Sequence, residues 1–140
     1  MKGVVFTEFL ELVESKFSLE MVDRIIEKAN LPSGGIYTAV GTYDHDEIVS
    51  LVSELSNETD VPVPDLLKIF GDHMFGQFHV GYPVFFEGID NAFDFLAKVE
   101  DYIHVEVKKL YPDAELPSVK YEMKSPDEMV VFYKSVRPMA

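Results

Sequence analysis

The last long segment of the chain reads Val130-Val131-Phe132-Tyr133-Lys134-Ser135-Val136-Arg137. Its residues fall into two alternating sets, and a period of two predicts a β-strand. Side chains two residues apart leave the same face of a strand, so Tyr133, Ser135 and Arg137 form one row of hydroxyls and a guanidinium. Such a row suits a small anionic group, because Arg presents a planar fork to a carboxylate or phosphate and hydroxyls add donors. Taken alone, the pattern is more typical of an ordinary edge strand whose polar side faces water.

A long helix is predicted upstream, over residues 90–111, with Asp90 as its N-cap and Tyr111-Pro112 at its end. Its main apolar stripe consists of Ala92, Leu96, Val99 and Ile103. His104 flanks this stripe near the C-terminal end of the helix. A lone histidine beside an apolar stripe is more often a hydrogen-bonded core residue than a metal ligand.

The combination of a helix histidine, a loop with Pro117 and Y-x-S-x-R on a strand resembles the haem nitric oxide/oxygen-binding (H-NOX, HNOB) family. This family is related to the haem domain of soluble guanylate cyclase. The resemblance covers the whole chain and includes the opening Met1-Lys2-Gly3, which precedes an amphipathic helix. It implies a haem b (iron protoporphyrin IX) cofactor whose iron is bound by His104, with Pro117 pressing on the porphyrin from the proximal side. It also implies that three motif side chains bind the haem propionates: Tyr133, Ser135 and Arg137.

On the same resemblance, the distal wall comes from the first helix and from a helix over residues 64–80. The four relevant positions are all apolar: Val5, Phe9, Met74 and Phe78. Bound O₂ carries partial negative charge and needs a donor such as a Tyr hydroxyl, whereas NO and CO need none. O₂-binding family members carry a distal Tyr a few residues past the motif Arg, a position that falls beyond Ala140, and polar side chains where this chain has Phe9 and Met74. The resemblance therefore implies a ferrous NO sensor that excludes O₂.

The expected function is a haem-based gas sensor that binds NO and CO and is not an enzyme. We expect it to signal through release of His104 from the iron, and the resemblance implies a histidine kinase or a cyclic-di-GMP enzyme as partner. One alternative is an O₂-binding or redox haem protein of the same fold. Another is a haem-free interaction domain in which His104 and Arg137 make a buried polar contact. Enzymatic functions are weakly supported, because the sequence contains no Ser/His/Asp set, phosphate-binding loop or metal-spaced cluster.

The predicted fold class is α+β: a helical N-terminal part packed on a C-terminal antiparallel sheet, with haem between them. Helices are expected over residues 3–17, over 18–29 with Ser18 as N-cap, after Asp44 and over 64–80. Strands over residues 119–125 and 128–136, joined by Pro126-Asp127, form a hairpin. We expect a single haem-binding sensor domain over residues 1–140 that lacks the family's C-terminal segment. Its exposed sheet edge then predicts self-association.

The composition limits the partners. The net charge of −13 argues against nucleic acid, whose binding needs clustered Lys and Arg, and against an anionic membrane surface. The absence of cysteine excludes a disulfide framework, thiolate ligation of haem and a Cys-based zinc site. Neither a signal peptide nor a run of about 18 apolar residues is present, so we expect a cytoplasmic protein.

Two further groups of polar residues have simpler explanations than a metal site. The acidic cluster Asp44-His45-Asp46-Glu47 lies where a helix begins, and acids are favoured there by the helix dipole. Asp44 and Glu47 also have the spacing of a capping box. His73 and His79 are predicted to be surface or packing residues, because their spacing points them in different directions around a helix.

Overall fold

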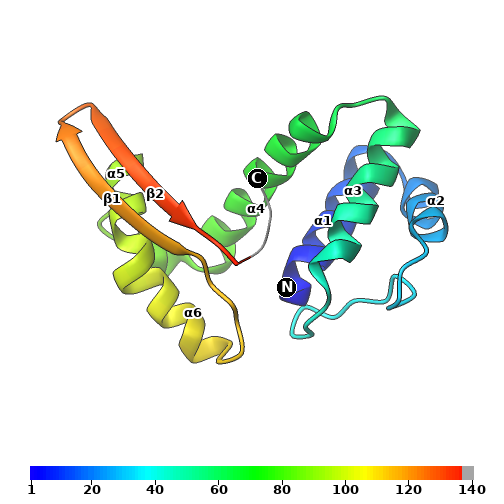
Figure 1. Ribbon diagram of the computed structural model, residues 1–140, viewed down its shortest axis with the longest axis horizontal. Coiled ribbons are helices and arrows are strands. Elements are labelled where there is room, and N and C mark those ends of the chain that lie inside the picture. The colour runs from blue at the N-terminus through cyan, green and yellow to red at the C-terminus, as the bar shows by residue number, and fades with distance from the viewer. Residues whose placement is uncertain (137–140) are drawn as a thin grey trace. The chain divides into compact units, whose positions relative to one another are not determined.

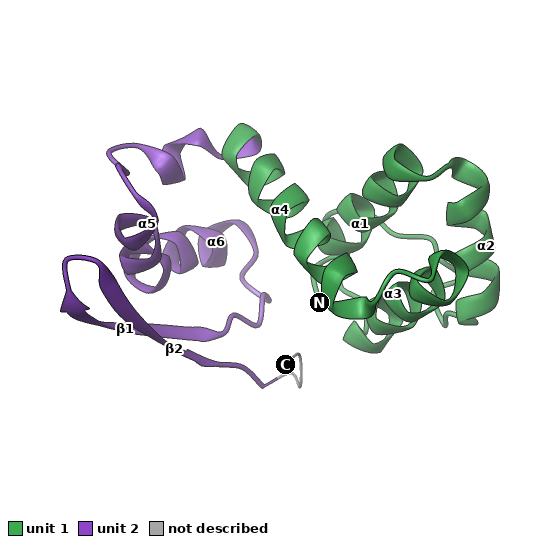
Figure 2. Ribbon diagram, turned by 90° about the horizontal axis from the view of Figure 1, so that it is seen from above, with its two compact units in different colours: residues 1–80 green, residues 81–140 purple. Residues whose placement is uncertain are grey.

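The computed structural model describes residues 1–136 and has an α+β fold (Figure 1). The chain divides into two compact units, unit 1 with residues 1–80 and unit 2 with residues 81–140 (Figure 2). None of the helices formed by the described residues is both long and apolar enough to cross a membrane.

Unit 1 is helical. Its elements are α1 (Gly3–Lys16), α2 (Leu19–Ala29), α3 (His45–Thr59) and α4 (Val63–Gly81), which ends one residue inside unit 2. The predicted N-cap of α2 is confirmed, since Ser18 Oγ accepts a hydrogen bond from Met21 N at 3.2 Å. Asn30 and Asp60 adopt left-handed backbone conformations directly after α2 and α3, which ends both helices.

The core of unit 1 is formed by the apolar faces of its helices, and Figure 1 shows α1, α2 and α3 gathered around it. Six large side chains there are almost completely shielded from solvent: Phe6, Phe9, Val13, Ile25, Leu51 and Leu55. Burying one such side chain stabilises a fold by about 1.5–3 kcal/mol. Unit 1 therefore has an apolar core of its own.

The start of α1 is held by the loop that connects α2 to α3. The N–H groups of a first helical turn have no partner within the helix. Here Gly3 N donates to the carbonyl of Gly41 at 2.8 Å, and Val4 N donates to that of Ala39 at 3.0 Å. A Cβ atom on Gly3 would lie 1.9 Å from the Thr38 carbonyl oxygen, so only glycine permits this approach.

Glu47 has a different role from the predicted capping box. Asp44 caps α3 as predicted, because its side chain accepts a hydrogen bond from Asp46 N at 3.1 Å. The Glu47 carboxylate is instead buried, and its Oε2 accepts hydrogen bonds from Ser33 Oγ and, at 2.8 Å, from the Tyr37 hydroxyl. These contacts fasten the α2–α3 loop to α3.

Unit 2 combines a helical run with a hairpin. Its elements are the 3₁₀ turn η1 (Pro83–Phe86), α5 (Ala92–Lys98), the π-helical turn η2 (Val99–Ile103), α6 (His104–Leu110), β1 (Ser118–Ser125) and β2 (Glu128–Lys134). The strands are antiparallel, and Val119 lies opposite Tyr133. The predicted hairpin is confirmed.

The long helix of unit 2 differs from the prediction in two ways. Asn91, not Asp90, is the N-cap, because its Oδ1 accepts hydrogen bonds from Phe93 N and Asp94 N at 2.9 and 3.0 Å. The helix is also interrupted by η2, directly before His104. A regular 3.6-residue pattern cannot predict a wider π turn, which is stabilised by its surroundings.

The last strand is shorter than predicted. β2 ends at Lys134, so Tyr133 lies in the strand but Ser135 follows it. Arg137 lies outside the described residues. The expected row of three side chains on one regular strand is thus confirmed only for Tyr133.

Tyr37 provides a pH-dependent test of the Glu47 contacts. The pKa of Tyr37 is raised to about 12. Burial is the main cause, and the Glu47 carboxylate contributes to the same shift. Tyr37→Phe should lower the free energy of unfolding at neutral pH by about 0.5–1.5 kcal/mol, the value of one hydrogen bond. Because the folded-state pKa is raised, this advantage of the wild type is complete below pH ~10 and is lost as the pH rises towards 12.

Denaturant titrations of both proteins between neutral and alkaline pH provide the measurement. Curves of stability against pH that stay parallel for wild type and Tyr37→Phe would show that the hydroxyl is not held as described.

Candidate functional site

One ring nitrogen of His104 contacts a carboxylate, and the other has no hydrogen-bond partner among the described residues. His104 is the first residue of α6, and its side chain is 16% exposed. Its Nδ1 lies 3.2 Å from Glu100 Oε2, and among residues 1–136 its Nε2 has no hydrogen-bond partner. A carboxylate can only accept, so this contact favours the neutral tautomer with the proton on Nδ1. The lone pair of Nε2 is then available to a metal.

Glu100 contacts strand β1 as well as His104. The same Oε2 atom accepts a hydrogen bond from Val119 N at 2.9 Å. This backbone bond is the main cause that lowers the pKa of Glu100 below its usual range, and His104 and Lys120 lower it further. Glu100 is therefore ionised at neutral pH and can accept hydrogen bonds from both His104 Nδ1 and Val119 N. Sequence reasoning missed this residue, although the i, i+4 spacing from the histidine was a usable signal.

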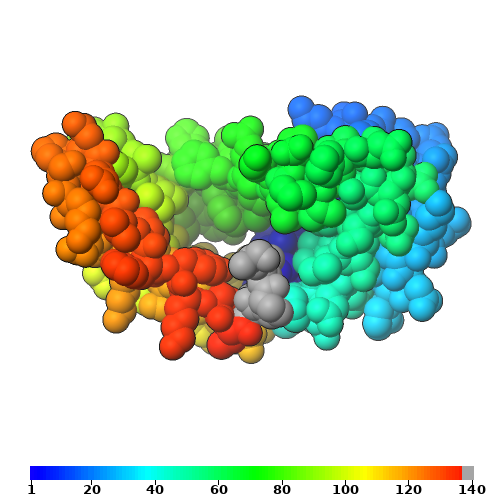
Figure 3. All heavy atoms as spheres, turned by 45° about the horizontal axis from the view of Figure 1, so that its top comes forward, coloured from blue at the N-terminus to red at the C-terminus, as the bar shows by residue number. Residues whose placement is uncertain are grey.

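The propionate motif begins on the strand opposite Val119. Tyr133 lies in β2 as the partner of Val119, and it is 61% exposed. Figure 3 shows the hairpin, in orange to red, with its side chains on the surface of the molecule. Ser135 is half-buried just after the strand, and Pro117 is half-buried two residues before Val119. Unit 2 thus contains His104, Pro117, Tyr133 and Ser135, whereas Arg137 lies outside the described residues.

The predicted distal residues lie in unit 1 and differ in burial. Phe9 is 1% exposed and packs edge-to-face on Phe70, with ring centroids 5.3 Å apart. Val5 and Met74 are partly buried and pack against the same core, whereas Phe78 is exposed. Phe9 is thus first of all a core residue of unit 1. Its helical spacing alone cannot distinguish a core position from a pocket position.

A polar contact between α1 and α4 was not predicted. His73 Nε2 lies 3.1 Å from Glu8 Oε2, and both side chains are partly buried. His73 is therefore a packing residue, one of the two roles expected for it. The two residues directly precede Met74 and Phe9, so the contact fixes the helices next to two predicted distal positions.

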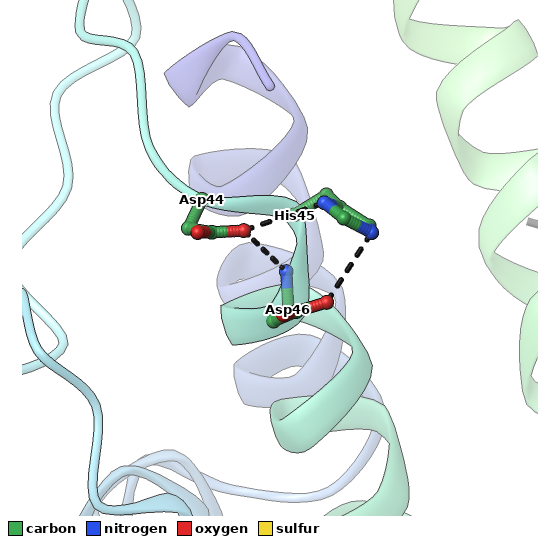
Figure 4. Close-up of side chains that lie close together, drawn as sticks. All are labelled: Asp44, His45 and Asp46. Carbon is green, nitrogen blue, oxygen red and sulfur yellow. Dashed lines mark hydrogen bonds and ion pairs between the residues drawn. The ribbon is translucent and has the colours of Figure 1, made fainter. Parts of the chain in front are cut away.

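The acidic cluster at the start of α3 fits the capping explanation (Figure 4). His45 places Nδ1 3.3 Å from an Asp44 carboxylate oxygen and Nε2 3.2 Å from an Asp46 oxygen. Among the described residues, Asp44, His45 and Asp46 are the group whose ligand atoms lie close enough together to hold a metal ion, but both carboxylates are exposed. Asp44 also uses an oxygen to cap the helix.

A surface groove of about 640 Å³ in unit 2 is separate from these residues. It lies between α5 and the hairpin, where Phe93, Ala97, Tyr121 and Met129 contribute to its lining. None of the predicted site residues lines it, so it does not correspond to a site built on His104.

The residues of unit 2 fit haem as a cofactor. Haem iron in sensors and globins takes a neutral imidazole nitrogen as its proximal ligand, and His104 offers Nε2 in that form. A carboxylate on the other ring nitrogen is the usual partner of a metal-bound histidine. The exposed Tyr133 hydroxyl adds a donor that could bind a carboxylate.

Comparisons with known proteins agree with this assignment. The family model described as "Haem-NO-binding" matches residues 2–140. The H-NOX protein of K. algicida, solved in the unliganded Fe(II) state, is 46% identical, with a TM-score of 0.90 over 97% of this chain and 74% of that one. The H-NOX of Shewanella woodyi, solved with bound IWP-051 in the Fe(II)CO state, is 42% identical, with a TM-score of 0.84 over 100% of this chain and 74% of that one.

A more distant structure shares the fold. The H-NOX protein of S. oneidensis in the Fe(II)NO state is 24% identical, with a TM-score of 0.86 over 97% of this chain and 75% of that one. A search of curated proteins found no match. The family match over nearly the whole chain, together with the K. algicida and S. woodyi relatives, shows that the chain belongs to the haem-NO-binding (H-NOX) family.

Proposed function

We propose that the protein is a haem-based NO sensor in which His104 binds the iron through Nε2. The observation that carries this proposal is the state of the imidazole: Nδ1 is held by an ionised carboxylate and Nε2 is unpartnered among the described residues. The contact orients the imidazole ring and, in its neutral form, places the proton on Nδ1, which leaves the Nε2 lone pair for a metal. Ferrous haem b, when bound, would supply a site for diatomic gases such as NO and CO, and His104 would hold its iron through Nε2.

The hairpin is proposed to hold the propionates. Tyr133 and Ser135 offer hydroxyl donors, and Arg137 supplies a charge-assisted, planar contact to a carboxylate. The exposure of Tyr133 supports this proposal, because it leaves the hydroxyl accessible to a carboxylate.

The distal side is proposed to select NO and CO over O₂. The four residues assigned to it have apolar side chains: Val5, Phe9, Met74 and Phe78. They cannot donate a hydrogen bond to the partial negative charge of bound O₂. Substituting a polar side chain for Phe9 would be costly, because Phe9 is part of the core of unit 1.

Signalling is proposed to follow from the release of His104. His104 would tie α6 to the cofactor when it holds the iron, and its release would allow the helix to relax. A ligand shifts such an equilibrium only by its differential affinity for the two states, so CO should signal weakly. The proposed receiver is a histidine kinase or a cyclic-di-GMP enzyme, and the protein itself is proposed to have no catalytic turnover and to be cytoplasmic. The relatives solved with CO and with NO on Fe(II) support a gas-sensing role.

Visible spectra of the reduced protein test this function. We expect a Soret band in the purified protein, a complex with NO in which iron has five ligands, a six-ligand complex with CO, and no stable complex in air. A protein without a Soret band after reconstitution would contradict haem binding. A stable oxygen complex would favour the alternative of an O₂-binding protein, and six ligands at saturating NO would exclude release of His104.

Haem retention in two strand variants tests the propionate contacts. Arg137→Ala should weaken haem binding by about 1.5–3 kcal/mol, the value of a hydrogen bond to a charged group. Lys134→Ala is the matched control, because it also removes one positive charge from the motif. Lys134 follows Tyr133 in β2, so its side chain leaves the face of the strand opposite to that of Tyr133.

Transfer of haem from each variant to apomyoglobin measures the difference. Equal transfer rates in the two variants would contradict the assignment of Arg137 to the propionates.

A further inference from the structure

We propose that Glu100 is the positioning residue of the sensor, which fixes the ligand tautomer of His104 and couples this histidine to strand β1. The proposal rests on the proposed function in one respect, namely that His104 is the iron ligand. It concerns a residue outside the histidine and the Y-x-S-x-R motif.

The argument begins with a single atom. Oε2 of Glu100 lies 3.2 Å from His104 Nδ1 and 2.9 Å from Val119 N. The two donors are separated along the chain, since Val119 follows Glu100 by 19 positions. One carboxylate oxygen therefore connects the helix that carries the ligand with the first paired residues of the hairpin.

The helix geometry supports a specific role for this contact. The π turn η2 covers Val99–Ile103, so Glu100 lies within it and His104 follows directly. Its closing hydrogen bond runs from His104 N to the carbonyl of Val99. π turns are rare and occur frequently at functional sites, because the surroundings must stabilise the wider turn. Here the two side-chain contacts of Glu100 provide part of that stabilisation.

The strand contact carries the coupling towards the propionate motif. The N–H group of a residue in an antiparallel strand points to one side only. That of Val119 is used by Glu100, while Val119 pairs with Tyr133 on its other side. A displacement of His104 that moves Glu100 must therefore alter the edge of β1 at the position where Tyr133 begins the motif.

The chemical consequence concerns the strength of the ligand. A carboxylate that accepts the Nδ1 proton raises the basicity of Nε2 and fixes the ring orientation, and loss of such a partner typically costs about 10–100-fold in metal affinity or activity. Glu100 thereby sets how strongly His104 resists release. Weakening this contact should make release of the histidine easier for every gas.

The test uses Glu100→Gln and Glu100→Ala in the full chain, with Glu106→Gln as the matched control. Glu106 lies on α6 two residues from His104, but its carboxylate pairs with Lys109 at 2.6 Å. In the haem-free protein, ¹⁵N shifts of the His104 ring report the tautomer, and hydrogen exchange of the Val119 amide reports the strand contact. In the reduced haem protein, the iron–histidine stretching band reports the strength of the ligand.

We expect Glu100→Ala to lose the tautomer preference, to speed up Val119 exchange and to lower the frequency of the iron–histidine band. Glu100→Gln keeps an oxygen for Val119 but not the charge, so exchange should stay close to wild type while the band still shifts down. Glu106→Gln should match wild type in all three measurements. Haem loss should be about 10-fold faster or more in Glu100→Ala than in the control.

Three outcomes separate the possible failures. A His104 ring and a Val119 amide unchanged in Glu100→Ala would overturn the proposal, as would equal effects of the Glu106 control. A wild-type protein that takes up no haem would overturn the proposed function, whereas the two haem-free measurements would still decide whether Glu100 positions His104. An iron–histidine band unchanged in both Glu100 variants would overturn the claim that Glu100 tunes the ligand.

Discussion

The hydrogen bonds of one carboxylate, that of Glu100, join the helical run of unit 2 to its hairpin. They join His104 on α6 to Val119 on β1, at 3.2 and 2.9 Å from the same oxygen. Unit 2 has few other means to do this, since its buried apolar side chains among the described residues are Phe85, Ala114 and Val119. A two-stranded hairpin is marginally stable by itself, so with so small a core the polar contacts to the neighbouring helical run contribute to fixing its arrangement.

Unit 1 is built on the opposite principle. Its core of large apolar side chains is complete without a ligand, and the start of α1 is fixed by backbone hydrogen bonds to the α2–α3 loop. Gly3 permits this close approach, which explains in physical terms the opening Met1-Lys2-Gly3. The helices that carry the proposed distal residues are further joined by the contact between Glu8 and His73. The proposed distal residues thus lie in the unit with the large apolar core, and His104 lies in the unit with the small one.

Local patterns in the sequence predicted most of the elements. Polar caps at Ser18 and Asp44, and the turn Pro126-Asp127, placed two helix starts and the hairpin correctly, because each depends on neighbouring residues alone. His104 was singled out only through the resemblance to the family, since its own surroundings are typical of a core histidine. What the sequence could not provide depends on distant partners.

Three carboxylates illustrate this limit. Glu8 meets His73, 65 positions away, Glu47 meets Ser33 and Tyr37, and Glu100 meets Val119. By local pattern Glu47 was assigned to a capping box, whereas neither Glu8 nor Glu100 was given a role. The π turn before His104 and the end of β2 at Lys134 likewise depend on tertiary surroundings that no periodicity records.

The most direct test of the account is a His104→Gly variant supplied with free imidazole. The central claim is that the bond between His104 and iron controls the conformation of unit 2. Free imidazole can fill the place of the missing side chain, but it is not attached to α6. If the link between helix and iron were unimportant, amide hydrogen exchange across α6, β1 and β2 in the imidazole-bound variant would match that of the unliganded wild type. The account predicts instead that His104→Gly shows the exchange pattern of the NO-bound wild type, both with and without imidazole, because the helix is no longer tied to the cofactor. An exchange pattern equal to that of the unliganded wild type would contradict it.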